Sequence, residues 1–198
     1  MARKKRGKDN FLKRNYKLSW NYLKESKNFI YLAVLAFFGF AVIGFLYPNF
    51  FRQEIIDFLN ELVQKTQNLN QFEMIKFIFL NNLQSSLIGM IFGIFLGIIP
   101  LIILIINGYV LGFVSYMAVN ESGIGVLWKL FPHGIFELPA VFISLGLGMK
   151  LGAFIFQKNK LNYFKKSFMN SIRIFVFIVI PLLIIAAIIE GTLILMFG

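Results

Sequence analysis

The sequence contains no cysteine and only one histidine among its 198 residues. Without cysteine there is no disulfide framework, and no thiolate to act as nucleophile or metal ligand. One histidine with carboxylates makes a poor zinc site, so neither a metal nor another cofactor is expected. Charged residues are also scarce, at 15% of the chain, which is too few for a water-soluble protein of this size. These shortages exclude disulfide-rich folds and argue against a soluble protein.

Apolar residues are what the chain has in abundance. Hydrophobic residues make up 58% of it and aromatic residues 17%. They gather in runs of about 20 residues, which as helices match the ~30 Å hydrocarbon layer of a bilayer. The predicted fold is therefore all-α: a polytopic α-helical membrane protein with about five transmembrane helices and amphipathic interfacial helices.

Turn signals and prolines divide the apolar sequence into five predicted spans. The first closes at Pro48, Pro100 is expected to kink the second, and Asn107-Gly108 predicts a turn before the third. A proline-broken or re-entrant segment is expected near residues 131–139, at the start of the fourth. The predicted spans cover residues 29–47, 83–106, 109–119, 131–156 and 174–197.

Three further segments place apolar and charged residues on opposite helical faces. Residues 1–28 are predicted to form a basic tail with an interfacial helix, residues 49–80 an external amphipathic segment, and residues 157–173 a basic connector. The apolar face of the tail helix carries Leu12, Tyr16, Trp20 and Leu23. Residues 29–198 are expected to form a single membrane domain.

The net charge of +11 comes mostly from two basic blocks beside the spans. Ten Lys or Arg lie in residues 1–28 and six in residues 150–173, whereas residues 49–80 hold three basic and four acidic residues. The positive-inside rule predicts a cytoplasmic N-terminus and an external C-terminus in the cell membrane. Anionic lipid headgroups, and not nucleic acid, are the expected partners of the basic blocks. No cleavable signal peptide is expected, because the first apolar run is too long for a signal-peptide core.

The stretch FPHGIFELPA, residues 131–140, places polar residues where a span is predicted to begin. His133 and Glu137 are four residues apart, so they share a helical face and can touch. Proline suits the first turn of a helix, whereas a later proline frees a backbone carbonyl and bends the segment. Glu190 is the other acid in apolar surroundings. The predicted polar pocket comprises His133, Glu137, Glu190, Asn81, Asn82, Pro132 and Pro139.

Two interpretations of this pocket stay open. Its side chains either hold bent helices together or form a site that moves a proton, an ion or a polar ligand. Hydrolysis is not expected, because no nucleophile elbow surrounds any serine and only one histidine could serve as a base. The serines considered are Ser85, Ser86, Ser115 and Ser144. The chain is predicted to have no catalytic residues and not to be an enzyme.

Glycines recur along the predicted spans. Gly89, Gly93 and Gly97 are spaced by four, which places a flat stripe on one helical face where another backbone can approach closely. The stripe serves either packing within the chain or a homodimer. The glycines assigned to helix packing are Gly89, Gly93, Gly97, Gly108, Gly112, Gly148 and Gly152.

Three blocks of the sequence resemble a known family. The signature blocks of the stage II sporulation protein M family of integral membrane proteins are similar to NNLQSSLIGMIFGIFLGIIPLIILIINGYVLG, FPHGIFELPAVFISLGLGMKLG and IIAAIIEGTL, in this order. The positions that transfer are Asn82, Asn107, Gly108, Pro132, His133, Gly134, Glu137, Pro139, Gly148, Gly152 and Glu190. The resemblance implies a five-span protein without known enzymatic activity. In spore-forming bacteria the namesake is similar to a scaffold that holds cell-wall hydrolases at the engulfing septal membrane.

The leading functional prediction is an integral membrane scaffold that recruits or positions unknown protein partners through its external segment. The alternative is a transporter, channel or lipid-moving protein that uses the His/Glu pocket. A homo-oligomer is possible under either interpretation. The two differ in one testable property: a conduit needs titratable groups at Glu137 and Glu190, whereas a scaffold tolerates Glu137→Gln.

Overall fold

A computed structural model describes residues 2–197, and it describes side chains at residues 11–127 and 134–194. Its α-helices are α1 (Ala2–Glu25), α2 (Lys27–Leu46), α3 (Arg52–Thr66), α4 (Gln71–Ile91), α5 (Ile98–Ser122), α6 (Phe131–Gly152), α7 (Lys160–Ile174) and α8 (Ile180–Phe197). The shorter segments are the 3-10 helices η1 (Phe92–Ile94), η2 (Ile124–Leu130) and η3 (Ala153–Phe156) and the π-helical η4 (Phe175–Val179).

Five helical stretches of the described chain are long and apolar enough to cross a membrane. They cover Lys27–Leu46, Gln71–Ile94, Ile98–Ser122, Gly134–Phe156 and Lys160–Ile194. The fourth is the central one: 61% of its most apolar window is buried, against 17–33% for the others. The predicted all-α, polytopic fold is confirmed.

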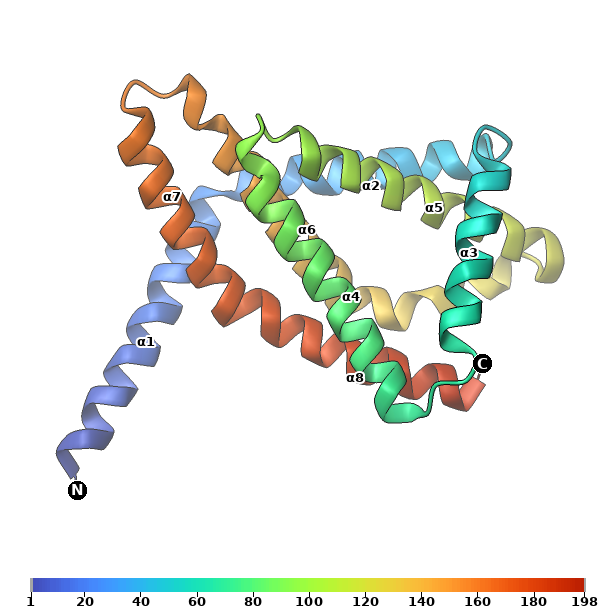
Figure 1. Ribbon diagram of the computed structural model, residues 1–198, viewed down its shortest axis with the longest axis horizontal. Coiled ribbons are helices and arrows are strands. Elements are labelled where there is room, and N and C mark those ends of the chain that lie inside the picture. The colour runs from blue at the N-terminus through green and yellow to red at the C-terminus, as the bar shows by residue number, and fades with distance from the viewer. Residues whose placement is uncertain (1, 198) are drawn as a thin grey trace.

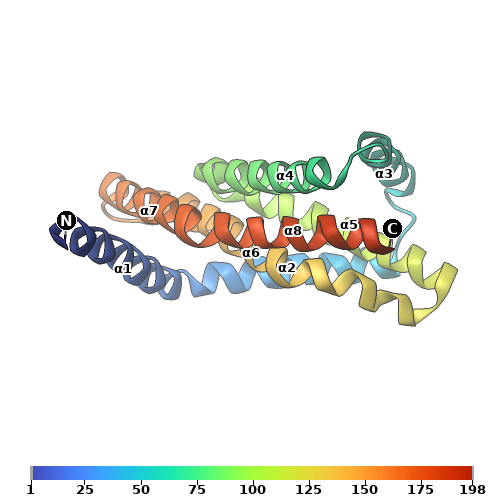
Figure 2. The ribbon, with the colours of Figure 1, turned by 90° about the horizontal axis from the view of Figure 1, so that it is seen from below.

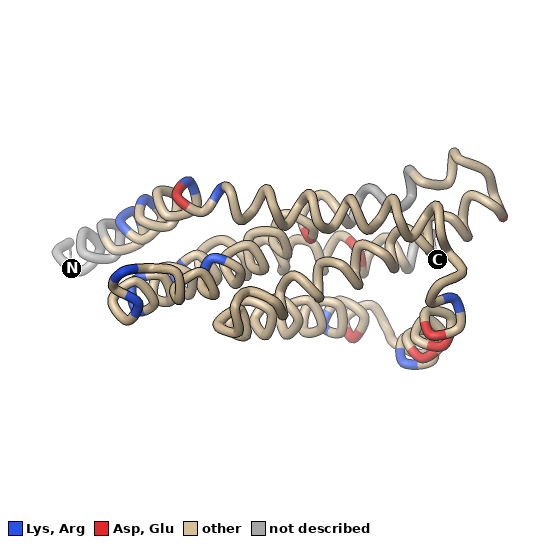
Figure 3. The backbone as a smooth tube through the Cα atoms, turned by 90° about the horizontal axis from the view of Figure 1, so that it is seen from above, with Lys and Arg blue, Asp and Glu red and all other residues tan. Residues whose placement is uncertain are grey.

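The two ends of the bundle carry different elements and different charges. α2 and α5 lie side by side, α1 extends away from the bundle at one end, and α3 crosses the opposite end (Figures 1 and 2). Lysine and arginine gather on α1 and α7, whereas Asp and Glu gather on α3 (Figure 3). We call these the basic end, formed by α1 and α7, and the α3 end, formed by α3 and η2.

The second and third spans meet at a different place from the one predicted. The chain turns at Leu96 and Gly97, whose φ angles of 61° and 72° are left-handed. Asn107 and Gly108 instead continue α5, and the Asn107 side-chain amide donates to the carbonyl of Ile103 at 2.8 Å. The predicted turn at Asn107-Gly108 is therefore wrong, because the asparagine satisfies its hydrogen bonding inside the helix.

The second span also begins earlier than predicted, at Gln71. Asn70 and Glu73 form a reciprocal capping box there, with bonds of 3.0 and 3.1 Å between each side chain and the other's backbone N–H. Residues 71–80 were predicted to be external but form the first part of α4. Pro100, which was expected to kink a span, is buried in the first turn of α5, where a missing N–H costs nothing.

The segment near residues 131–139 is neither broken nor re-entrant. α6 continues from Phe131 through Pro139 to Gly152. Pro139 removes the bond to the carbonyl of Ile135, but packing against α2, α4 and α8 keeps the helix continuous. The side chains of Pro132 and His133 lie outside the described residues.

Candidate functional site

Glycines bring α2 and α5 into backbone contact. A Cβ atom added to any of three glycines would overlap a backbone carbonyl of the other helix, in the pairs Gly44 with Tyr109, Gly108 with Phe37 and Gly112 with Ala41. The hydroxyl of Tyr109 also donates to the carbonyl of Tyr47 at the α3 end of the pair. We call this contact the α2/α5 seam. Side chains larger than hydrogen would separate its two helices.

A second contact, the α4/α6 seam, uses the predicted glycine stripe. Its close approaches pair Gly89 with Leu145, Gly93 with Gly148, Gly97 with Met149 and Gly152 with both Gly93 and Gly97. The hydroxyl of Ser144 crosses the seam and donates to the carbonyl of Ser86 at 2.7 Å in a buried position. The stripe therefore faces α6 of the same chain.

A cavity of about 840 Å³ lies between the two seams, bounded by α2, α4, α5 and α6. α4 and α5 diverge from the turn that joins them, and α3 crosses between their far ends (Figure 1). The lining reaches Leu127 and Gly134 at the α3 end and Ile103 and Leu145 deeper in the bundle. The cavity thus extends from the α3 end into the bundle.

Most of the cavity wall is apolar, and it includes Phe37, Phe38 and Phe142. The polar residues that line it are Asn81, Asn82, Ser85, Ser86, Asn107, Ser115 and Glu137. Asn81, Ser85 and Asn107 have exposed side chains although they lie within membrane spans. Polar groups within a span are costly when they face lipid, so their gathering around one cavity makes this cavity the candidate site.

The predicted acidic residues meet beside this cavity. The carboxyl groups of Glu137 and Glu190 are neighbours, and the Asn82 side chain adjoins Glu137. Oε2 of Glu190 is buried without a hydrogen-bond partner. Two adjacent carboxyl groups in apolar surroundings are stable only when a proton or a cation neutralises their charge. The arrangement can therefore attract a cation or a donor group.

The other predicted pocket residues lie in two different places. Asn81 and Pro139 line the same cavity. His133 and Pro132 belong to the first turn of α6, and their side chains lie outside the described residues. Among the described residues, no group of three His, Asp or Glu side chains lies close enough to hold a metal ion.

Several cavity residues were not assigned to the pocket from the sequence. Asn107 was named among the positions of the family resemblance, but its place before glycine was interpreted as a turn. Phe37, Phe38 and Ser115 gave no signal, because their role depends on which helices become neighbours. Had the third span been predicted to begin near Ile98, Asn107 would have lain inside it as a polar residue, which marks a candidate intramembrane site.

A second polar cluster, also missed, ties α1 to the bundle at the basic end. The Lys150 ammonium donates to the Ser26 hydroxyl at 2.9 Å and lies 3.8 Å from the centre of the Tyr22 ring. Tyr22 is 5% exposed, and burial raises the pKa of its phenol to about 12. Arg173 of α7 donates to the Asn15 side chain at 3.0 Å, so α1 is linked to α7 as well as to α6. These contacts make the basic end a structural anchor.

Most of the chain is similar to a known protein family. The family model of stage II sporulation protein M matches residues 32–193. An uncharacterised protein of Methanocaldococcus jannaschii is 29% identical over 173 residues, which cover 83% of this chain and 73% of that protein. No solved structure matches. The family match runs from the first span to the last and includes the cavity.

Proposed function

The chain belongs to the stage II sporulation protein M family, and we propose that it is an integral membrane scaffold that positions partner proteins at the cell membrane. One observation carries this proposal: α3 packs on the bundle with one face and leaves the other free. Ile55 is buried against Tyr109 and Phe113 of α5, whereas Phe58 and Val63 are 52% and 58% exposed. A helix that is fixed in place yet exposes apolar side chains suits protein contact.

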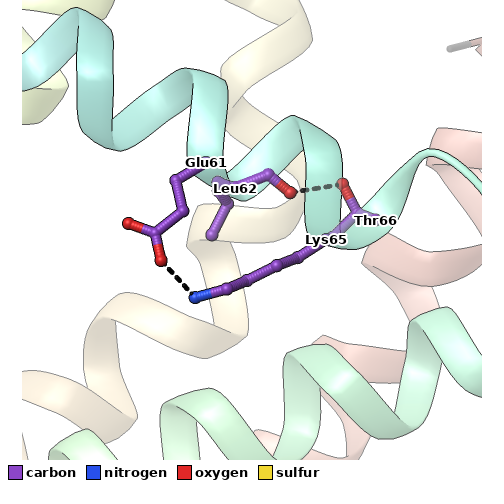
Figure 4. Close-up of polar contacts among 4 residues, drawn as sticks. All are labelled: Glu61, Leu62, Lys65 and Thr66. Atoms are coloured by element: carbon purple, nitrogen blue, oxygen red, sulfur yellow. Dashed lines mark hydrogen bonds and ion pairs between the residues drawn. The ribbon is translucent and has the colours of Figure 1, made fainter.

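The charged groups of α3 add to this surface without adding much stability. Glu61 and Lys65 form an exposed ion pair of 2.6 Å, and the hydroxyl of Thr66 donates to the carbonyl of Leu62 (Figure 4). Exposed pairs of this kind contribute little to stability, because water screens the two charges. Their side chains are therefore available to a partner at little cost to the fold.

The proposed orientation places the basic end in the cytoplasm and the α3 end outside. It is supported by the lysines and arginines of α1 and α7, which the positive-inside rule assigns to the cytoplasmic face (Figure 3). The exposed aromatic side chains Tyr16 and Trp20 of α1 suit the headgroup layer. The proposed partner surface is therefore external. We propose no enzymatic activity.

Site-specific photo-cross-linking in native membranes tests the scaffold. A photoreactive residue at Phe58 or at Val63 is expected to capture the same protein, because both positions lie on the exposed face of α3. The control position is Leu35 of α2, which is 70% exposed within a span and is expected to capture lipid. Capture of lipid alone at all three positions would contradict the proposal.

The cavity favours transport, including lipid movement, as a second candidate function. A cavity that extends from the membrane surface past Glu137 toward mid-bilayer is what a conduit or carrier requires. The test is flux of protons, common ions and fluorescent lipids across sealed liposomes. A scaffold gives no flux above protein-free liposomes, whereas a transporter gives flux that Glu137→Gln removes from a folded protein.

A further inference from the structure

We infer that the cavity between α2, α4, α5 and α6 binds an amphiphile with a protonated amine as its head and an apolar chain as its body. The inference concerns binding alone and goes beyond the scaffold role. It stands whether or not the protein moves this ligand. Flux and binding are measured separately, so failure of one leaves the other intact.

The size and composition of the cavity indicate an amphiphile. Its volume of about 840 Å³ lies within the range of roughly 300–1,000 Å³ that is usual for small-molecule sites. Aromatic and aliphatic side chains form most of the wall, while amides, hydroxyls and one carboxyl interrupt it. A purely polar ligand would leave the apolar wall against water, and a purely apolar ligand would leave the polar groups unpaired. A molecule with both parts satisfies both.

The charge of the lining selects a cationic head. Glu137 is the charged residue among the described lining side chains, and the Glu190 carboxyl lies beside it. An anionic head would meet two carboxyl groups, whereas an ammonium would neutralise them. The aromatic rings of Phe37, Phe38 and Phe142 in the same wall also present faces that attract cations.

Accessible oxygen atoms in the wall favour an amine with N–H donors. Asn81, Ser85 and Asn107 line the cavity and are exposed. Their amide and hydroxyl oxygens can accept hydrogen bonds. A primary ammonium carries three donors in a small volume, so it can donate to Glu137 and to such oxygens together.

Equilibrium dialysis of the full chain in nanodiscs tests the inference, with radiolabelled dodecylamine as the probe and empty nanodiscs as the background. Saturable binding of about one amine per chain is expected. Dodecyltrimethylammonium is expected to compete more weakly because it lacks N–H donors. Dodecanol and dodecyl phosphate, which have the same chain length, are expected to compete least. This series separates the head from the tail.

Matched variants locate the site. Glu137→Gln is expected to lower the affinity at least about tenfold, because a charge-assisted hydrogen bond is lost. Glu121→Gln removes an equal charge from the α3 end of α5, outside the lining, and is expected to leave the affinity unchanged. Ser115→Phe adds a large side chain to the cavity wall while both carboxyl groups are kept, and it is expected to remove saturable binding.

Three results would overturn the inference. They are an absence of saturable binding above empty nanodiscs, competition by dodecyl phosphate as strong as that by dodecyltrimethylammonium, and unchanged affinity in a folded Glu137→Gln protein. Should that variant fail to fold, unchanged binding in Ser115→Phe would overturn it equally.

Discussion

The α4/α6 seam and the polar part of the cavity wall lie at two ends of the same helical stripe. On α4 and η1, which continues it, Asn82, Ser86, Gly89 and Gly93 follow one another at spacings of four, three and four, so they lie along one face. Toward the basic end the stripe consists of glycines, and the backbones of α4 and α6 touch. Toward the α3 end it consists of polar side chains that line the cavity. The difference teaches that residue size along one stripe decides where the bundle is closed and where it is open.

The largest expected effect comes from adding one methyl group inside the α4/α6 seam, which would push its two helices apart. A Cβ atom on Gly93 would overlap the backbone of Gly148, whereas one on Gly39 of α2 meets no atom within 4 Å. Gly93→Ala is expected to lower the free energy of unfolding by about 2–3 kcal/mol, because backbone must move. Gly39→Ala is expected to be neutral or stabilising by up to about 1 kcal/mol. Thermal unfolding in one detergent measures both, and equal midpoints would contradict the close packing.

A smaller effect is expected from the hydrogen bond across the same seam. Ser144→Ala removes the buried donor to the Ser86 carbonyl and is expected to cost about 1 kcal/mol, as polar bonds between spans do. Ser115→Ala is the matched change in the cavity, and it is expected to alter stability by less than about 0.5 kcal/mol. A larger loss of stability from Ser115→Ala than from Ser144→Ala would contradict the stabilising role of the hydrogen bond across the seam.

The contacts of Tyr22 at the basic end predict that the stability of the protein depends on pH in the alkaline range. Burial raises the pKa of Tyr22 to about 12 from the model-peptide value of 10.0, so the folded state favours the neutral phenol. Stability from this group is fully present below pH ~10 and is lost as pH rises through ~12, by on the order of 2 kcal/mol. Tyr22→Phe should remove this part of the pH dependence and cost little at pH 7, since the hydroxyl has no hydrogen-bond partner. Unfolding midpoints of the wild type and of Tyr22→Phe from pH 8 to 12 check both expectations. Identical pH profiles for the two proteins would contradict the role of Tyr22.

The smallest effect on stability is expected outside both regions, on α3. Lys65 holds the pKa of the exposed Glu61 carboxyl below its usual value through a hydrogen bond and its charge. Lys65→Met is expected to raise that pKa toward the usual value while the unfolding midpoint stays unchanged. Titration of Glu61 by NMR measures the first and thermal unfolding the second. A lowered midpoint would mean that this ion pair helps to hold the bundle.

The sequence was enough to predict the helical, five-span membrane fold, because hydropathy and helix length depend on local composition. It also suggested that Glu137, Glu190 and Asn82 meet, since span counting placed them at one depth. The turn at Leu96 and Gly97 was not predicted, because the apolar run continues through it without a polar residue. The partners of the glycines and the wall of the cavity were also beyond prediction, since both depend on contacts between distant spans.

Cysteine accessibility tests the central claim, that a cavity lined in part by polar side chains opens from the α3 end to mid-membrane depth. The chain has no cysteine, so Asn107→Cys and Ile106→Cys can each be labelled without background. Asn107 lines the cavity about 22 Å from the α3 end of α5, at ~1.5 Å per residue, whereas Ile106 beside it is 56% exposed outside the lining. With a cationic, membrane-impermeant thiosulfonate, Asn107→Cys should react at least about tenfold faster than Ile106→Cys, and equal rates at the two positions would contradict the account.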